Sequence, residues 1–335
     1  MTAVTAFAPG RVNLIGDHTD YTGGFALPFA LDLGTTVEAM VGGDAVVLRS
    51  ADARGVASVP IDVEDPAAVE PSWARYVAGV VAETHPAAGL RGQVSTTLPV
   101  GAGLSSSAAL ELAVALALGF EGTPLELALT CQRAEQRASG VPSGVMDQLA
   151  SAAGVDGHAL LIDCTSLTVT PVPVPDEVEV VVVHSGEERA LAGSAYGERR
   201  ATCEAATAVI GPLREARLTD LARIADPVVR RRARHVLTEN ARVLEMVEAL
   251  AAGDHRAAGA LLSASHASLA TDFDVSTPGL DALVARLTAL PGVHGARLTG
   301  AGFGGCVVAL GERGALGGEG WHVRPGDGAR VTTTG

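Results

Sequence analysis

Residues 98–113 read LPVGAGLSSSAALELA, a turn rich in glycine and serine that leads into an apolar segment typical of a helix. Residues 93–98 before it favour a strand, so the turn joins a strand to a helix. Its glycines let backbone N–H groups converge, and the helix N-terminus adds unpaired donors and the positive end of the helix dipole. Capping requires only one serine, Ser105, whereas three are present. The turn therefore predicts a phosphate site, with simple helix capping as the alternative.

Length and composition favour two domains and a small-molecule partner. The chain has 335 residues, of which 47% are hydrophobic and 19% charged, enough to fill two cores. A net charge of −14 opposes nucleic-acid and anionic membrane surfaces, so we expect no nucleic acid and no membrane. The sequence shows no leader or spanning pattern, and its four cysteines form no C-x-x-C pair. We expect a cytoplasmic protein with reduced thiols.

The chain contains no lysine, and all 24 of its basic residues are arginine. A Walker A loop and a protein kinase each require a lysine on the nucleotide phosphates, and a Schiff-base enzyme requires an amine. These classes are excluded. A phosphate site in this chain must therefore take its positive charge from a helix dipole, Mg²⁺ and an arginine.

In the middle of the chain, capping signals predict where helices begin and end, and a proline-rich segment predicts a domain boundary. Thr123-Pro124-Leu125-Glu126 combines an N-cap, a proline at the first helical position and a reciprocal glutamate, so we expect a helix over 124–139 that ends at Gly140. Ser143 is expected to cap the next helix. The segment TPVPVPDE, residues 170–177, is the best candidate for a domain boundary. Periodicity predicts strands over 37–41, 46–48, 158–163, 178–183 and 306–310, and helices over 73–81, 195–210, 227–252, 255–270 and 278–290.

Two acidic residues on neighbouring predicted helices have contrasting surroundings. Asp147 lies in the first helical turn after Ser143, where the dipole keeps a carboxylate ionised and able to accept a hydroxyl proton. Glu135 lies late in its helix, where the dipole disfavours the charge. It therefore needs a compensating cation, which is either Mg²⁺ or a neighbouring arginine such as Arg133 or Arg137. Ordinary dipole stabilisation of Asp147 and a surface salt bridge of Glu135 remain the alternatives.

The stretch GRVNLIGDHTDYTGG, residues 10–24, gathers an arginine, two carboxylates and a histidine between glycines. Asp17, His18 and Asp20 fit no standard metal-ligand spacing. Carboxylates accept pairs of hydroxyl hydrogens and an imidazole can donate or accept, so these three residues suit a polyhydroxylated substrate better. GAGFGG, residues 300–305, satisfies G-x-G-x-x-G, but it opens a β-branched run instead of a helix, so it favours tight turns over a dinucleotide site.

Several of these motifs together resemble one family. GRVNLIGDHTDYTGGFALP resembles the galactokinase signature, and LPVGAGLSSSAALELA and LTGAGFGGC are similar to the second and third motifs of the GHMP kinases. Further similar segments follow in the family order over about residues 5–310: SWARYVAGV, SGVMDQLAS, SAYGERRATCEAA, RRARHVLTENARV and SHASLATDFDVSTPGLD. The resemblance implies an α+β, two-domain GHMP kinase fold. Its N-terminal domain, expected over 1–172, would be like domain 2 of ribosomal protein S5, and its C-terminal domain, over 173–335, would be ferredoxin-like.

The resemblance also implies a reaction and a set of site residues. It implies transfer of a phosphoryl group from ATP to the anomeric hydroxyl of D-galactose, with Asp147 as the base and Arg11 stabilising the transferred group. The matching sugar contacts are Asp17, His18, Thr19, Asp20, Asp147 and Tyr196. The matching ATP contacts are Gly101, Ala102, Gly103, Leu104, Ser105, Ser106 and Ser107. Ser107 and Glu135 match the Mg²⁺ ligands. We expect a monomer whose partners are ATP and galactose or a close sugar.

Three departures from the family pattern bear on the substrate. Position 17 is Asp where the signature usually has Glu, which withdraws the carboxylate by one methylene. Arg189 stands where the family usually has His, and the chain is shortened around residues 50–70 and at its C-terminus. The first alternative is therefore a kinase for a related sugar such as L-arabinose or galacturonate. The second is a catalytically silent sensor of sugar and ATP, against which the intact serine loop, Arg11 and Asp147 argue.

Overall fold

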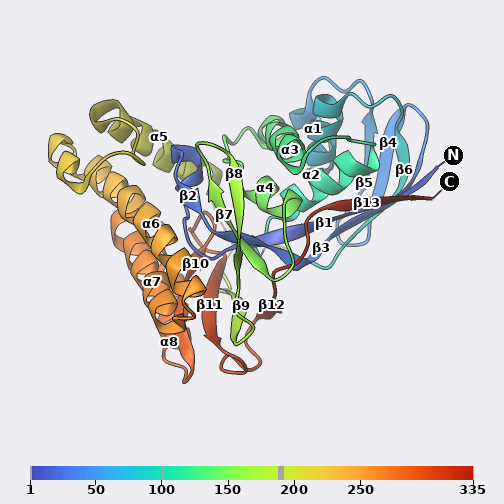
Figure 1. The fold of residues 1–335 in the computed structure, drawn as a ribbon. Coiled ribbons are helices and arrows are strands. Elements are labelled where there is room, and N and C mark those ends of the chain that lie inside the picture. Colours follow the sequence, from blue (N-terminus) through green and yellow to red (C-terminus); the bar gives the residue numbers. More distant parts are fainter. Residues whose placement is uncertain (1, 100–101, 188–191, 335) are drawn as a thin grey trace.

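A twisted six-stranded sheet carries the first half of the chain (Figure 1). The computed structural model describes residues 2–99, 102–187 and 192–334. The sheet has the order β13-β1-β3-β6-β4-β5, with β4 and β6 parallel and the other pairs antiparallel. Its strands are β1 (Ala3–Asn13), β3 (Pro28–Val41), β4 (Ala45–Ser50), β5 (Val56–Pro60), β6 (Leu90–Thr96) and β13 (Arg330–Thr334). Helices α1 (Ala74–Thr84), α2 (Ser106–Ala117) and α3 (Pro124–Ser139) cover one face of it.

The second half of the chain forms an antiparallel four-stranded sheet with helices packed on it. The strand order is β10-β11-β9-β12, and α7 and α8 lie against β10 and β11. The strands are β9 (Val178–His184), β10 (Val293–Thr299), β11 (Cys306–Glu312) and β12 (Trp321–Val323). The helices are α5 (Ala192–Ile210), α6 (Pro227–Ala251), α7 (His255–Ser268) and α8 (Pro278–Thr288), with the short 3₁₀-helix η3 (Leu218–Arg223) and the π-helical turn η4 (Leu269–Phe273) between them.

Smaller elements complete the first half and lead to the second. The three-stranded sheet has the order β2-β7-β8, formed by β2 (Phe25–Ala26), β7 (His158–Asp163) and β8 (Thr168–Pro173). The short elements are η1 (Asp20–Thr22), η2 (Pro66–Ala68) and α4 (Met146–Ala152). The division at 172/173 falls at the end of β8, while β13 returns from the C-terminal end to pair with β1. We retain the two ranges as a proposal, with β13 assigned to the first sheet.

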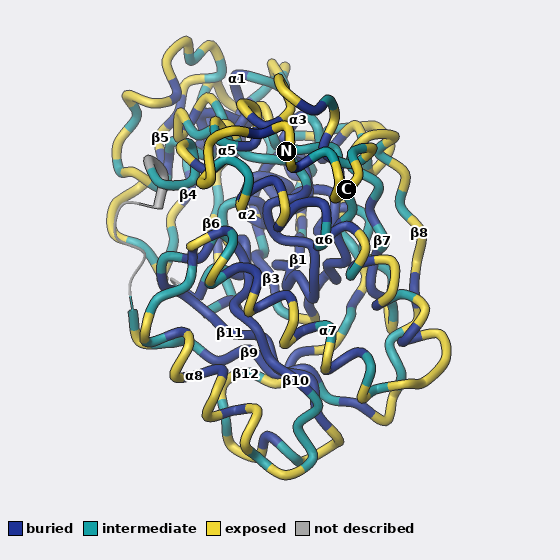
Figure 2. The backbone as a smooth tube through the Cα atoms, turned by 90° about the vertical axis from the view of Figure 1, so that its left-hand side faces the viewer, coloured by how far each residue is buried: buried dark blue, intermediate teal, exposed yellow. Residues whose placement is uncertain are grey.

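A shared apolar core joins the two halves. Ile15 and Leu27, just beyond the paired ends of β1 and β3, and Phe29 of β3 pack in one apolar cluster with residues of the second half such as Val182 and Val243. All five side chains have an exposed fraction of 0%. Figure 2 shows this continuous buried region through β1, β3, β9 and β11. The segment that follows β1 is thus held by the second half. In the described ranges no helix is long and apolar enough to cross a bilayer.

Capping signals in the sequence bound α3 correctly but not α4. The helix predicted over 124–139 is confirmed as α3, with Thr123 Oγ1 accepting from the Glu126 amide at 3.2 Å and Gly140 ending it at φ 71°. The prediction that Ser143 caps the next helix is wrong. Helix α4 follows Val145, and the Ser143 hydroxyl instead donates to Glu135 Oε2 at 3.2 Å. Gly144, between Ser143 and α4, lines the cavity described below, and the Ser143 side chain is directed to Glu135 instead of to the first turn of α4.

Candidate active site

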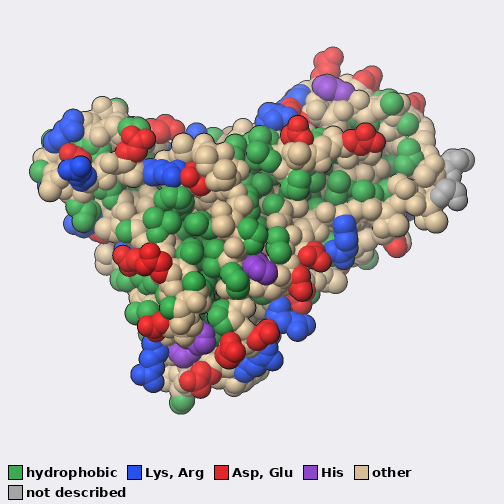
Figure 3. Space-filling model, in the orientation of Figure 1, with side chains coloured by type: hydrophobic (Ala, Val, Ile, Leu, Met, Phe, Trp, Pro, Cys, Tyr) green, Lys and Arg blue, Asp and Glu red, His purple; other side chains and the backbone are tan. Residues whose placement is uncertain are grey.

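A cavity of about 780 Å³ opens between the two halves of the molecule. Figure 3 shows a hollow in the surface between the part of the molecule that carries α5 and the part that carries α1 and α3. Residues from both halves line it, including the predicted site residues Arg11, Asp17, His18, Asp20, Gly103, Ser105, Ser106, Ser107, Glu135, Asp147 and Tyr196. The structure therefore brings eleven residues that are scattered along the sequence to one place.

Arg11 and Asp147 form a two-bond ion pair in this cavity. Arg11 Nε donates to Asp147 Oδ1 at 2.8 Å, and Arg11 NH2 donates to Oδ2 at 2.6 Å. Arg11 NH1 donates to the Gly103 carbonyl at 3.0 Å, which ties the arginine to the serine-rich turn. The Arg11 side chain is 6% exposed and that of Asp147 31%. The guanidinium is thus fixed, while the carboxylate still reaches the cavity.

The serine-rich turn supplies the third bond to Asp147. Ser105 precedes α2 with φ 57°, and its hydroxyl donates to Asp147 Oδ2 at 2.5 Å instead of capping the helix. Ser105 therefore does not act as the simple helix cap that the sequence left as the alternative. Ala102 and Leu104 are buried and do not line the cavity. The predicted contact at Gly101 lies outside the described residues.

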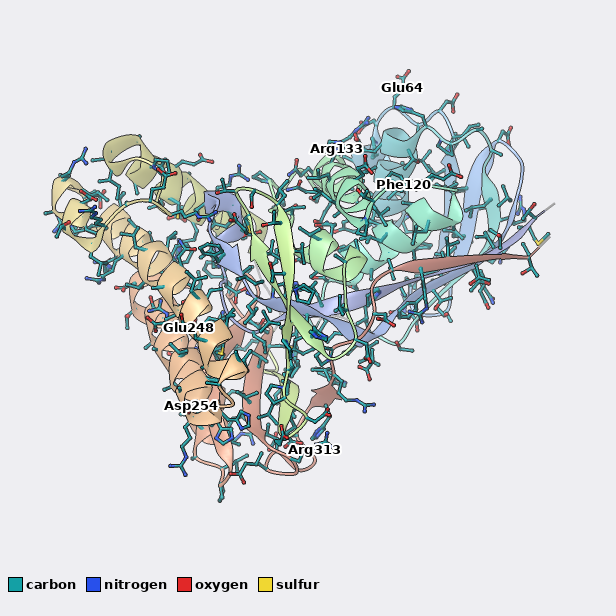
Figure 4. The ribbon with its side chains drawn as sticks, in the orientation of Figure 1. Glu64, Phe120, Arg133, Glu248, Asp254 and Arg313 are labelled. Atoms are coloured by element: carbon teal, nitrogen blue, oxygen red, sulfur yellow. The ribbon has the colours of Figure 1, made fainter. Side chains whose placement is uncertain are left out.

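Glu135 accepts hydrogen bonds from two hydroxyls and an amide, and the neighbouring arginines pair elsewhere. Glu135 Oε1 accepts from Ser107 Oγ at 2.8 Å, and Oε2 accepts from Gln148 Nε2 at 2.9 Å. Arg133 and Arg137 both pair with Glu83, at 2.8 and 3.2 Å, and Figure 4 labels Arg133 at the outer side of α3. Burial, with the charge of Asp147, raises the pKa of Glu135. In this structure the salt-bridge alternative for Glu135 is therefore not realised.

Asp20 is another of the acids that line the cavity. Burial raises the pKa of its carboxyl to about 7, and the charge of Asp147 adds to the shift. A Cβ atom at Gly144 would lie 1.7 Å from Asp20 Oδ2, so only glycine at position 144 lets the carboxylate occupy this place. The carboxyl groups of Asp20 and Asp147 thus face the same polar cavity as those of Asp17 and Glu135, an arrangement suited to accepting several hydroxyl hydrogens.

His18 and Tyr196 add aromatic surface to the cavity. Burial, reinforced by His235, lowers the pKa of His18 to about 3. The neutral ring lies 2.9 Å from Tyr21 Oη through Nδ1 and 3.3 Å from the Ala301 carbonyl through Nε2. Since a carbonyl only accepts, Nε2 donates and Nδ1 accepts. The Tyr196 ring centroid lies 5.6 Å from that of His18.

Asp17 and Thr19 are bonded within the protein. One Asp17 carboxylate oxygen, Oδ1, accepts from the Gly300 amide at 3.1 Å, and Oδ2 pairs with Arg297. The Thr19 hydroxyl donates to the carbonyls of Gly16 at 2.8 Å and Phe25 at 2.6 Å, and Thr19 does not line the cavity. These two residues shape the loop around His18 and Asp20, and their direct contact with a sugar remains a prediction.

Sequence reasoning missed several contributors to the site. The additional lining residues are Tyr76, Ser139, Val141, Ser143, Gly144, Met146, His184, Gly300 and Ala301. Arg297, which has an exposed fraction of 0%, was also missed. One signal was present, because GAGFGG, residues 300–305, predicted tight turns that include Gly300 and Ala301. Within the ranges described here, no three or more His, Cys, Asp or Glu residues form a metal cluster.

Comparison with known families defines the class of protein. Residues 74–155 match the family description "GHMP kinases N terminal domain", and residues 246–317 match "GHMP kinases C terminal". The structure of Methanococcus jannaschii mevalonate kinase superposes with a TM-score of 0.68 at 19% identity, covering 99% of this chain and 96% of that chain, which is a likeness of fold. The fold and the site thus define a GHMP kinase, and the predicted α+β fold is confirmed.

More specific matches define the family. Residues 2–40 match the description "Galactokinase galactose-binding signature". The galactokinase of Chloroflexus aurantiacus is 44% identical over 329 residues, covering 91% of this chain and 83% of that protein. Human galactokinase is 43% identical over 329 residues, covering 92% and 83%. A crystal structure of Lactococcus lactis galactokinase complexed with galactose superposes with a TM-score of 0.90 at 33% identity, covering 98% and 95%. The chain belongs to the galactokinase family and is a sugar kinase.

Proposed function

We propose that this enzyme transfers the γ-phosphoryl group of ATP directly to the anomeric hydroxyl of D-galactose, with Asp147 as the base and Arg11 stabilising the transferred group. The overall reaction is the one that defines the galactokinase family, and it yields galactose 1-phosphate and ADP. The roles of Asp147 and Arg11 are supported by the two hydrogen bonds between their side chains in the cavity.

The pair supports proton transfer and charge stabilisation at one place. Asp147 accepts two hydrogen bonds from the Arg11 guanidinium while its side chain, 31% exposed, still reaches the cavity, where it can accept the hydroxyl proton. The bonds from Arg11 and Ser105 also fix its direction. When the phosphoryl group is transferred, negative charge develops on its oxygens beside the guanidinium, which costs little reorganisation because Arg11 is already held by Gly103.

We assign Mg²⁺ to Ser107 and Glu135. The hydroxyl and the carboxylate lie 2.8 Å apart, and both are oxygen donors of the kind that Mg²⁺ prefers. Glu135 is a half-buried carboxyl, and Arg133 and Arg137 of the same helix pair with Glu83 instead, so a cation would offset the cost of its charge. When bound, Mg²⁺ neutralises charge on the nucleotide phosphates. One carboxylate and one hydroxyl suit an ion that takes its remaining ligands from phosphate and water.

The compartment and the oligomeric state follow as further proposals. Cys131 and Cys203 are buried thiols, which together with the use of ATP supports a cytoplasmic enzyme. The exposed large apolar side chains are spread over both halves of the chain, which supports a monomer: Met40, Val56, Val209, Leu218, Val228, Leu244 and Val331.

A panel of sugars tests the substrate. Asp17 is engaged by Arg297 and the Gly300 amide, so its carboxylate contributes less to a sugar than a freely projecting side chain would. We expect galactose to be the best substrate in ADP-release assays. L-Arabinose, galacturonate and N-acetylgalactosamine should have lower kcat/KM by about tenfold or more, since one lost polar contact costs about 1–3 kcal/mol. If another sugar exceeds galactose, the assignment of galactose is wrong, and a chain that phosphorylates none of them is a sensor.

The pH dependence of galactose binding tests Asp20. Its pKa of about 7 lies above the usual value, so its carboxyl is protonated below pH 7 and ionised above it. The ionised form accepts hydroxyl hydrogens through both oxygens, and we expect the KM for galactose to fall about fivefold between pH 6 and pH 8. Asp20→Asn should remove this dependence and leave the KM for ATP unchanged. The affinity of the native enzyme for galactose therefore increases with pH. The stability of the free protein instead decreases as pH rises through 7, because the pKa of Asp20 is raised in the folded state. A galactose KM in the native enzyme that is flat over this interval contradicts the role.

A further inference from the structure

Helix α6 buries three polar side chains against the loop that carries the sugar-site residues. His235 and Glu239 have an exposed fraction of 0%, and Asn240 of 7%. They belong to the motif RRARHVLTENARV, which the reaction described above does not use. Burying polar groups costs free energy unless they are hydrogen-bonded, so their partners indicate what they stabilise.

The partners lie at both ends of the loop formed by residues 16–25. Glu239 Oε1 accepts from the Gly16 amide at 3.0 Å, and His235 Nε2 donates to the Asp17 carbonyl at 3.2 Å. Asn240 Oδ1 accepts from the Phe25 amide at 2.8 Å. One helix of the second half of the chain therefore holds the backbone on both sides of His18 and Asp20.

The loop is shaped to receive these side chains. Gly16 has φ +95°, a left-handed conformation that favours glycine, and a Cβ there would lie 2.6 Å from the Phe25 carbonyl oxygen. A Cβ at Gly24 would lie 2.3 Å from Asn240 Oδ1. The glycine at position 16 thus lets the two ends of the loop lie close together, and the glycine at position 24 lets the loop backbone lie close to α6. The side chains of α6 then supply hydrogen-bond partners for the loop backbone.

The protonation states of the three side chains suit this task. Burial opposes the charge of Glu239, but His235, Arg297 and Arg242 hold the pKa of its carboxyl at about 2. Its other bonds are from Ser265 Oγ at 2.6 Å and Arg242 Nε at 2.8 Å. The His235 ring accepts from Ser268 Oγ at 2.8 Å through Nδ1, so Nε2 keeps the proton that bonds to Asp17. Each group acts as a fixed donor or acceptor at neutral pH.

We propose that His235, Glu239 and Asn240 are positioning residues that set the affinity for galactose by fixing the backbone of residues 16–25. The proposal rests on the function proposed above. Of the hydrogen bonds described here, those from the three side chains to the backbone go to this loop and not to the serine-rich turn. Their effect therefore falls on the KM for galactose, and the KM for ATP stays the same.

Asn240 offers the sharpest test because a conservative variant is available. Asn240→Leu removes the acceptor for the Phe25 amide at similar size. Asn240→Asp keeps Oδ1, and it replaces Nδ2, which has no hydrogen-bond partner in the structure. Glu239→Gln is the second variant, and it keeps an acceptor oxygen while losing the charge. Leu244→Gln, at a position 40% exposed on the same helix, is the matched control.

We expect Asn240→Leu to raise the KM for galactose and the galactose Kd measured by calorimetry by roughly tenfold, with the KM for ATP changed less than twofold. Asn240→Asp should restore both galactose constants to within about threefold of the native enzyme. Glu239→Gln should raise them by about threefold, and Leu244→Gln should leave them unchanged. Because calorimetry measures sugar binding without turnover, native enzyme that binds galactose but releases no ADP would overturn the proposed function alone. Variants of Asn240 and Glu239 with lower Tm but native galactose Kd would overturn this proposal.

Discussion

Replacing Asp147 by Asn should lower kcat for galactose phosphorylation by about 10²–10⁴-fold, the contribution expected of a positioned base. The amide cannot accept the hydroxyl proton at neutral pH. Its nitrogen would also face the Arg11 guanidinium, with which the native carboxylate makes bonds of 2.6 and 2.8 Å. We therefore expect a lower Tm together with the loss of turnover, measured as ADP release at saturating galactose and ATP.

A matched control separates the chemical effect from the loss of an ion pair. Glu319 also pairs with an arginine, Arg286, through two bonds, and its side chain is 29% exposed, close to the 31% of Asp147. Glu319→Gln removes a comparable pair outside the cavity and should leave kcat within twofold of the native value. Retention of more than a tenth of kcat by Asp147→Asn would show that another group removes the proton.

Local patterns predicted those elements whose ends are decided by neighbouring residues. The capping box at Thr123 and Glu126 and the glycine at position 140 bounded α3 correctly, because each acts within one helical turn. The same reasoning failed at Ser143, whose hydroxyl donates to Glu135 of the preceding helix and not to the first turn of α4. It also missed the role of Ser105, whose hydroxyl is directed to Asp147 and not to the first turn of α2.

Local sequence patterns alone could not predict which distant residues meet in the site. Arg11 and Asp147 are 136 positions apart, and only the resemblance to a family linked them before the structure was known. On α6, a buried histidine, glutamate and asparagine look in sequence like residues of a solvated face, because the pattern does not reveal the loop that covers them. Arg297 is harder still, since its partner Asp17 lies 280 positions away and no helical or strand period relates them.

The buried pair of Arg297 and Asp17 leads to the second large expected effect. Arg297 is 0% exposed and Asp17 is 2% exposed, and Arg297 NH1 also donates to the Leu14 carbonyl at 2.8 Å. Removing one partner leaves the other charge buried without compensation, which costs about 3–5 kcal/mol. We expect Arg297→Met and Asp17→Leu each to lower the free energy of unfolding by about this amount, a large share of the 5–15 kcal/mol typical of a folded protein.

The double variant distinguishes a charge pair from two separate packing sites. With both charges removed, neither partner is left unpaired. The double variant Arg297→Met/Asp17→Leu should therefore lose much less free energy of unfolding, measured in urea, than the sum of the losses of the two single variants. Arg313, whose side chain is 68% exposed and lies 3.8 Å from Asp176, is the control (Figure 4), and Arg313→Met should leave the unfolding midpoint unchanged. Since Asp17 also holds the Gly300 amide at 3.1 Å, the Asp17→Leu enzyme should have a raised KM for galactose. Single losses that simply add would mean that the two charges do not compensate each other in the folded enzyme.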